Sequence, residues 1–235
     1  MNVYEKKTVE DALKGNPYPG RGIIIGVNDE GNTVAAYFIM GRSPNSRNRV
    51  FVEKEDGIYT EPFDASKVED PSLIIYRAAA EKDGKFIVTN GDQTDTIYDG
   101  LAAGKTFKEA LEERCFEPDA PNYTPRISGI IYDDDYEISI LKSIDAEGTD
   151  CARYTYSYPK TAGLGHLIHT YVTDGSPLPT FNGEPVRLEL KGDVESLTDE
   201  IWDSLDEDNK ISLVVRVADK DGNAETKIVN KYIKE

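Results

Sequence analysis

Short strand-like segments joined by turn sequences dominate this chain of 235 residues. Residues 22–27 form a continuous apolar run, typical of a strand buried on both faces. The turn cluster at residues 28–32 joins this run to a second strand over 33–40, and similar hairpins are expected around residues 81–84 and 219–223. About a dozen such strands with three or four helices predict an α+β fold with more than one sheet. Two packed sheets with helices outside is one economical arrangement.

Helices are expected at residues 8–14, 94–103, 106–115 and 194–205. Thr106 and Glu109 have the spacing of a capping box, in which each side chain bonds the other's backbone N–H. Asp92 or Thr94 is placed to cap the helix at 94–103.

The chain carries 27 Lys and Arg against 44 Asp and Glu, a formal net charge of −17. This charge argues against a nucleic-acid partner and against an anionic membrane surface, because both bind basic faces. No apolar window reaches 18 residues, and the first residues lack the apolar core of a signal peptide. We therefore expect a cytoplasmic protein, and exposed strand edges make a homo-oligomer an open alternative to a monomer.

The number of cysteines also favours a cytoplasmic protein. The two cysteines, Cys115 and Cys151, are too few for a disulfide framework or a four-thiolate zinc site. They leave at most one disulfide, which a reducing compartment disfavours.

Acidic residues are distributed unevenly. Between Glu30 and Glu53 there is none, where the average density predicts about four. Two further acid-free windows lie at residues 120–132 and 151–173. The windows hold most of the candidate cations, namely Arg42, Arg47, Arg49, Arg126, Arg153, Lys160, His166 and His169. Buried strands shed charge and explain part of this pattern, but three arginines within eight residues suit a small-anion site.

Residues 41–49 follow a strand directly and combine three arginines with two serines and two asparagines. Arginine forks match phosphate oxygens, and hydroxyl and amide groups add neutral donors. The segment is thus a candidate cradle for phosphate or carboxylate, with a solvated loop between strands as the alternative.

Residues 89–96 lie between a strand and a helix and are polar or glycine almost throughout. Helix capping alone explains part of this composition. Contact with polar ligand atoms at the start of the helix is the functional interpretation.

Glu117 and Asp119 follow the expected second helix of this region. A carboxyl group beside prolines and apolar residues can have a raised pKa and act as an acid or base, and Glu117 is the better placed. A surface ion pair is the alternative.

His166 and His169 are three residues apart on an expected strand and therefore point to opposite faces. A shared metal ion is not expected, although His169 can still touch a ligand.

Taken together, three segments resemble the archaeal-type IMP cyclohydrolase family, which has bacterial relatives. They are YFIMGRSPNSRNR at 37–49, NGDQTDTI at 90–97 and NYTPRI at 122–127, in family order, with Tyr76 matching a further family tyrosine. The resemblance covers about residues 20–175. It implies one domain, with a C-terminal extension from about residue 186, and a four-layer α-β-β-α sandwich similar to the N-terminal nucleophile hydrolases.

The resemblance also implies a reaction. The enzyme would close the purine ring of 5-formamidoimidazole-4-carboxamide ribonucleotide (FAICAR), giving IMP and water, with no need for a metal or redox cofactor. The implied catalytic residues are Arg47 (preferred over Arg49), Tyr76 and Glu117. The implied substrate-binding residues are Arg42, Ser43, Asn45, Arg49, Asn90, Asp92, Thr94, Arg126 and His169. Two alternatives stay open, a non-catalytic purine-nucleotide-binding module of the same fold and an amidohydrolase acting on another amide.

Overall fold

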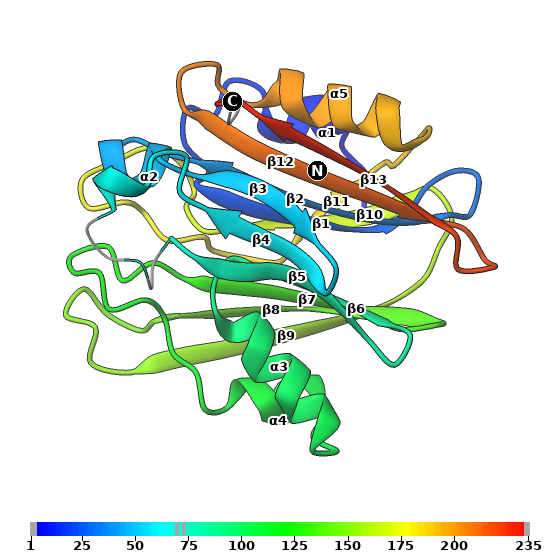
Figure 1. Ribbon diagram of the computed structural model, residues 1–235, viewed down its shortest axis with the longest axis horizontal. Helices are drawn as coiled ribbons and strands as arrows, with labels where there is room; N and C mark the ends of the chain where they lie inside the picture. The colour runs from blue at the N-terminus through cyan, green and yellow to red at the C-terminus, as the bar shows by residue number, and fades with distance from the viewer. Residues whose placement is uncertain (1–3, 69–70, 72–73, 233–235) are drawn as a thin grey trace.

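A computed structural model describes residues 4–68, 71 and 74–232 of the chain. Two antiparallel sheets lie face to face, and helices cover their outer faces (Figure 1). In the first sheet the strand order is β11 (Val186–Leu188), β10 (Leu164–His169), β1 (Arg21–Val27), β2 (Thr33–Met40), β12 (Lys210–Ala218) and β13 (Ala224–Asn230). In the second it is β3 (Val50–Lys54), β4 (Gly57–Glu61), β5 (Tyr76–Lys82), β6 (Lys85–Thr89), β7 (Arg126–Ile131), β8 (Asp135–Ser143) and β9 (Cys151–Pro159).

The helices occupy the two outer layers. Helices α1 (Val9–Leu13) and α5 (Val194–Ser204) lie on the first sheet, and α3 (Gln93–Ala102) and α4 (Phe107–Leu111) lie on the second (Figure 1). The short helix α2 (Pro44–Arg47) and a single 3₁₀ turn (Ala65–Lys67) complete the described elements. The α+β class with more than one sheet is therefore confirmed.

The apolar run in β1 is explained by burial on both faces. Ile23 and Ile25 pack in the core between the sheets, and Ile24 packs in the core beneath α1 and α5. The sheets approach closely here: a Cβ on Gly129 of β7 would stand 2.2 Å from Cδ1 of Ile25. A side chain at Gly129 would have to displace the buried Ile25 side chain.

The predicted helices are present with shifted ends. The capping box of Thr106 and Glu109 forms as expected at the start of α4. Asp92 precedes α3 but makes no capping bond with its side chain. Residues 41–49, expected as a loop, contain α2, because Ser43 caps it and Pro44 supplies a preset first residue. The strand expected over residues 166–173 ends at His169.

Residues beyond 186 are built into the first sheet. Strand β12 lies between β2 and β13, and α5 packs on that sheet through Leu197 and Ile201. The segment predicted as an extension thus supplies a central strand of the fold.

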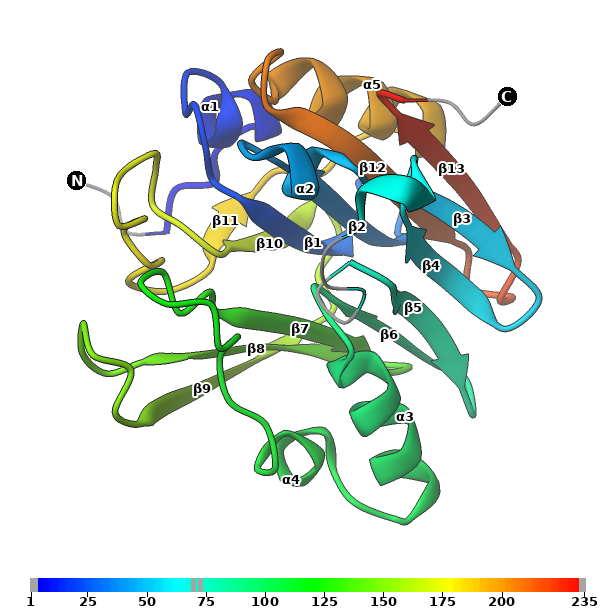
Figure 2. The same ribbon diagram turned by 60° about the vertical axis from the view of Figure 1, so that its left-hand side comes forward.

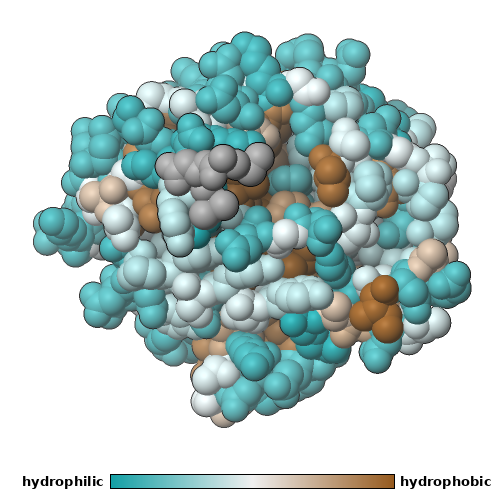
Figure 3. Space-filling model, turned by 180° about the vertical axis from the view of Figure 1, so that it is seen from behind, coloured by the Kyte–Doolittle hydropathy of each residue, from teal (hydrophilic) through white to brown (hydrophobic). Residues whose placement is uncertain are grey.

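The face of the molecule seen in Figure 3 is largely hydrophilic. On the face seen in Figure 3, apolar residues occur only as small separate patches. No helix in the described ranges is both long enough and apolar enough to cross a membrane.

Candidate active site

A cavity of about 250 Å³ opens at the end of the two sheets where β1 and β7 begin and β2 ends. Helix α2, the segment before β7 and the segment after β10 gather at this end in both ribbon views (Figure 2). The lining residues are Tyr18, Gly20, Arg21, Met40, Arg42, Ser43, Asn45, Ser46, Arg49, Glu117, Asp119, Asn122, Thr124, Tyr171 and Leu178.

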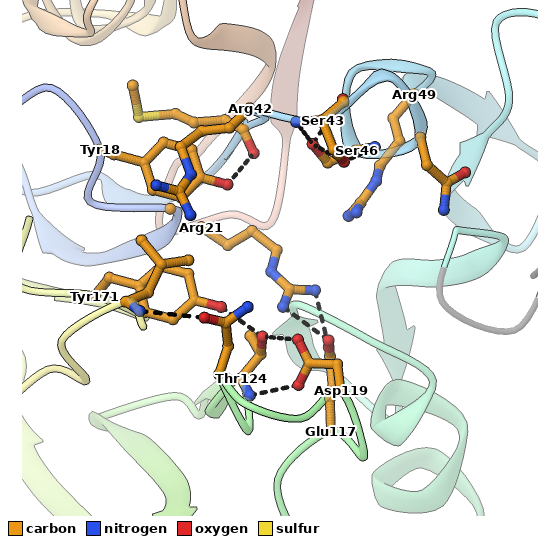
Figure 4. A pocket seen from close by; sticks show the side chains of 15 residues that line it. Tyr18, Arg21, Arg42, Ser43, Ser46, Arg49, Glu117, Asp119, Thr124 and Tyr171 are labelled. Carbon is orange, nitrogen blue, oxygen red and sulfur yellow. Dashed lines mark hydrogen bonds and ion pairs between the residues drawn. The ribbon is translucent and has the colours of Figure 1, made fainter. Parts of the chain in front are cut away.

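Arg21 and Glu117 form a buried ion pair at the cavity (Figure 4). Two parallel bonds join them, Nη1 to Oε1 at 2.8 Å and Nη2 to Oε2 at 3.0 Å. Nη1 also donates to the backbone oxygen of Asn90 at 3.0 Å. The bidentate geometry fixes the orientation of the Glu117 carboxylate. The alternative of a surface ion pair is therefore wrong, since both side chains are about 8 % exposed.

Arg49 enters the same cavity from the opposite side (Figure 4). Its Nε and Nη1 are buried and have no hydrogen-bond partner among the described residues, and the same holds for Oδ1 of Asn45. Buried guanidinium nitrogens are rarely left unbonded. Arg49 is thus the group in the cavity best prepared to receive an anionic or carbonyl oxygen.

Asp119 forms a second carboxyl site beside Glu117. It accepts bonds from the backbone N–H of Thr124 at 2.7 Å and from the Thr124 hydroxyl, which also contacts the Tyr171 hydroxyl. Burial raises the pKa of Asp119, partly offset by the Thr124 bonds. This network holds the wall of the cavity.

Arg42 lies at the mouth of the cavity. Its guanidinium is paired with Asp174 and bonded to the backbone oxygen of Gly175 at 3.0 Å, and it lies 5.0 Å from the centre of the Tyr18 ring. The arginine is 37 % exposed, so an incoming anion can reach it from solvent.

Tyr76 lies behind the cavity lining, between the sheets. Its hydroxyl is 2.7 Å from that of Tyr37, and both side chains are buried. Burial raises the pKa of Tyr37 well above its ordinary value, against the opposing charges of Arg21 and Arg49. Tyr37 therefore stays protonated and can donate to Tyr76.

Arg47 turns away from the cavity. Its guanidinium donates to the backbone oxygen of Asp208 and to Oδ1 of Asn209, the latter at 2.9 Å. Arg47 is the last residue of α2 and Arg49 lies two residues beyond it, so the two side chains have different surroundings. Arg49, which follows the helix, reaches the cavity that Arg47 was predicted to reach.

The segment at residues 90–97 does not line the cavity either. Asn90 bonds the backbone of Pro125 and Ile127, and the Thr94 hydroxyl bonds that of Thr89. Asp92 is paired with Arg114 and Arg126. These bonds join the start of α3 to β7, so the polar residues of this segment have a structural role.

The histidines likewise have protein partners. His169 shares a bond of 2.7 Å between Nδ1 and the backbone oxygen of Tyr171, and His166 bonds the Tyr136 hydroxyl at 2.7 Å. Within the described ranges, no three His, Cys, Asp or Glu side chains are grouped as metal ligands would be.

Several residues that line the cavity were not predicted from the sequence. Arg21 is the most important, and its signal was an arginine at the head of an apolar strand, beside a glycine. Tyr18, which stacks on Tyr171 with ring centres 5.9 Å apart, had no distinguishing pattern.

Comparison with known proteins identifies the family of this chain. A family model described as IMP cyclohydrolase-like protein matches residues 18–222. The IMP cyclohydrolase of Methanopyrus kandleri is 31 % identical over 144 residues, which cover 56 % of this chain and 72 % of that protein. The IMP cyclohydrolase of Methanocaldococcus jannaschii is 24 % identical over 208 residues, covering 87 % and 96 %. The chain therefore belongs to the IMP cyclohydrolase-like family.

Proposed function

We propose that this protein is an IMP cyclohydrolase, which closes the purine ring of FAICAR to give IMP and water. One observation carries the proposal: the carboxylate of Glu117 and the unbonded guanidinium nitrogens of Arg49 face one cavity. The names of the relatives agree with it.

Ring closure makes three chemical demands. The carboxamide nitrogen, a poor nucleophile, must lose a proton as it attacks the formyl carbon. The formyl oxygen then gains negative charge, which donors must stabilise. Finally the hydroxyl at that carbon must leave as water while the former formamide nitrogen loses its proton. Holding both groups of one molecule face to face contributes further, up to ~7–11 kcal/mol in ideal cases.

Glu117 meets the first and third demands. Held in one orientation by Arg21, its carboxylate accepts the amide proton during attack and passes it to the formyl oxygen, which becomes the hydroxyl. The carboxylate then takes the proton of the former formamide nitrogen and delivers it to the departing hydroxyl, which leaves as water. The Arg21 bonds also stop the carboxylate from rotating out of line.

Arg49 meets the second demand. It takes the role that the resemblance led us to expect of Arg47, because only Arg49 of the two lines the cavity. Its buried, unbonded donors can bind the formyl oxygen as charge develops.

Residues at the mouth of the cavity would bind the rest of the substrate. Arg42 and Ser43 are placed to hold the 5′-phosphate, with Asn45 nearby. Tyr76 is a positioning candidate, since it acts from behind the lining through Tyr37. Asn90, Asp92, Thr94, Arg126 and His169 would support the site indirectly, through the protein contacts described above.

The layering also supports the finer fold assignment. Helices, two antiparallel sheets and helices follow in the order α-β-β-α (Figure 1), as in the sandwich of N-terminal nucleophile hydrolases. Likeness of fold gives no support to amidase chemistry.

The test is incubation of the purified chain with FAICAR while the absorbance of the purine product is followed. Turnover supports the proposal. Tight binding of FAICAR or IMP without turnover would indicate the binding module, and neither binding nor turnover would favour an amidohydrolase for another substrate.

A further inference from the structure

Strand β9 forms one edge of the second sheet (Figure 2). It is nine residues long and pairs with β8 on one side, and among the described residues no strand pairs with its other side. Most of its middle residues are exposed. An open edge of this kind presents unpaired backbone groups that can bond another chain, and proteins usually block such edges with charges or cover them.

The other three edges of the described sheets are blocked in these ways. Strand β11 is only three residues long, and Lys7 is bridged to it. Strands β3 and β13 carry both acidic and basic residues, namely Glu53, Lys54, Glu225 and Lys227. Strand β9 has a single charged residue, Arg153, and no acidic one. Because a net charge of −17 makes copies of this chain repel one another, an acid-free edge is where two copies can approach.

Hydrogen bonds at the two ends of the β8–β9 pair show which backbone groups of β9 point outwards. The N–H of Lys160 donates to the oxygen of Asp134 at 3.0 Å, and the N–H of Ile144 donates to that of Asp150 at 3.2 Å. Both bonds continue the register of the two strands and join even-numbered residues. Bonded and non-bonded pairs alternate in an antiparallel ladder. The even-numbered residues of β9 therefore bond β8, and the odd-numbered residues turn their N–H and C=O groups to the open side.

Three odd-numbered residues, Arg153, Thr155 and Ser157, occupy the middle of this edge. In the described part of the chain, no hydrogen bond from outside the β8–β9 ladder reaches their backbone N–H and C=O groups. The row ends on both sides. The oxygen of Cys151 accepts a bond from the Arg153 guanidinium at 3.1 Å, and Pro159 has no N–H. The open backbone groups are therefore confined to three alternate residues.

We propose that β9 pairs antiparallel with β9 of a second copy of this chain, with the two-fold axis beside Thr155. Thr155 then lies opposite Thr155 of the other copy, and Arg153 lies opposite Ser157. In this register every open N–H and C=O group of the three residues is bonded, because all these residues form hydrogen-bonded pairs. The two seven-stranded sheets become one continuous sheet, and the contact is the self-complementary kind that closes a dimer.

The same register pairs side chains on both faces of the joined sheet. Tyr154, which is 46 % exposed, lies opposite Tyr156 of the other copy, on the face that packs against the first sheet. Aromatic pairs across strands stabilise antiparallel sheets. On the other face Arg153 lies opposite Ser157 of the other copy, whose hydroxyl donates to Oε1 of Glu137 at 2.9 Å. A cation of each copy is thus two strands, roughly 10 Å, from a carboxylate of the other.

The experiment measures the mass of the full chain in solution by light scattering and sedimentation, and we expect twice the mass of one chain. Thr155→Glu and Thr155→Lys each place two like charges beside the axis, so each variant should be monomeric. An equimolar mixture of the two should regain the dimer mass, because opposite charges then face each other. This recovery also requires that both variants are folded.

Thr226→Glu is the matched control, on the edge strand β13. The N–H of Asp219 donates to the oxygen of Asn223 in the β12–β13 register, so the backbone groups of Thr226 also point away from the neighbouring strand. This variant should keep the dimer mass. Amide hydrogen exchange in residues 151–159 should be slower in the unchanged chain than in the Thr155→Glu variant.

Three results would overturn the proposal: a monomeric unchanged chain, a dimer that both Thr155 variants retain, or a mixture of those variants that stays monomeric. Equal amide exchange in residues 151–159 of the unchanged chain and the Thr155→Glu variant would do the same. None of these measurements involves FAICAR or ring closure, so failure here leaves the proposed function intact.

Discussion

Arg21 and Glu117, from strand β1 and from the segment before β7, are joined by two parallel bonds of 2.8 and 3.0 Å at the cavity. The pair connects the two sheets of the sandwich at the point where the proposed chemistry takes place. It therefore serves the fold and the reaction together, and these roles can be separated by substitution.

Glu117→Gln keeps the shape and one acceptor for Arg21 but removes the base. We expect the rate of ring closure to fall by ~10²–10⁴, the range for loss of a general base. Affinity for IMP should change little. Glu112→Gln, an exposed carboxyl near the end of α4, is the matched control and should retain full activity. Normal turnover by the Glu117 variant would remove this residue from the mechanism.

Substitutions of Arg49 and Arg47 distinguish a residue that lines the cavity from one that only supports the nearby fold. Arg49→Ala should lower the turnover number by ~10²–10³, as for removal of an oxyanion donor. Arg47→Ala loses the bonds to Asp208 and Asn209 and should reduce the free energy of unfolding by about 1 kcal/mol, with turnover retained. The reverse ranking of the two variants in steady-state kinetics would restore Arg47 as the catalytic arginine.

Tyr37→Phe tests whether the hydroxyl of Tyr76 must be held in place. Loss of the 2.7 Å bond should cost about 1 kcal/mol of stability and lower the turnover number several-fold, with the Michaelis constant unchanged. Tyr136→Phe removes another buried hydroxyl contact, to His166, and should cost similar stability without affecting turnover. Equal kinetics for both variants would limit Tyr37 to packing.

The buried histidines predict a loss of stability in mild acid. Burial lowers the pKa of His166 and of His169 from 6.5 to about 4. Between these values the unfolded chain binds more protons, so stability is present above about pH 6.5 and falls as the pH drops towards 4. Each histidine should contribute a loss of about 2 kcal/mol between roughly pH 7.5 and pH 5.

Urea unfolding at the two pH values checks this, with His169→Gln for comparison. The variant cannot titrate at that position, so its acid-induced loss should be smaller by about 2 kcal/mol. An equal loss in both proteins would show that His169 does not carry the effect.

Local sequence patterns predicted the secondary-structure elements well but not the contacts between them. The apolar run of β1, the hairpins and the capping box of Thr106 depend on neighbouring residues, and each formed. The Arg21 and Glu117 pair joins residues 96 positions apart, and no short-range pattern encodes such a contact. The sequence indicated Glu117 as a candidate because its own segment is unusual, and Glu117 lines the cavity. Arg21 looked like the ordinary edge of a strand.

The polar segment at 90–97 was predicted to contact substrate, and the structure shows its side chains bonded within the protein. A run of amides, hydroxyls and a carboxylate suits both a ligand and a buried junction, because both need hydrogen bonds. Here Asn90 and Thr94 satisfy the backbone between α3 and β7, and Asp92 neutralises Arg126. Only the three-dimensional arrangement shows that these groups are already bonded while those of Arg49 are not.

Arg42 and Asp174 provide a test of where the substrate phosphate binds. In the structure Nη1 of Arg42 is paired with the carboxylate of Asp174, which therefore competes with an incoming phosphate for the guanidinium. Asp174→Asn should therefore lower the Michaelis constant for FAICAR several-fold, and Arg42→Ala should raise it by about tenfold or more, both with little change in turnover number. Because the interaction is with the phosphate, binding of inosine, which lacks that group, should be the same in both variants and the unchanged chain. Isothermal titration with IMP and inosine distinguishes this from a general effect on the cavity: a loss of inosine affinity in the Arg42 variant would place the phosphate elsewhere, and Arg49 would then be its next candidate.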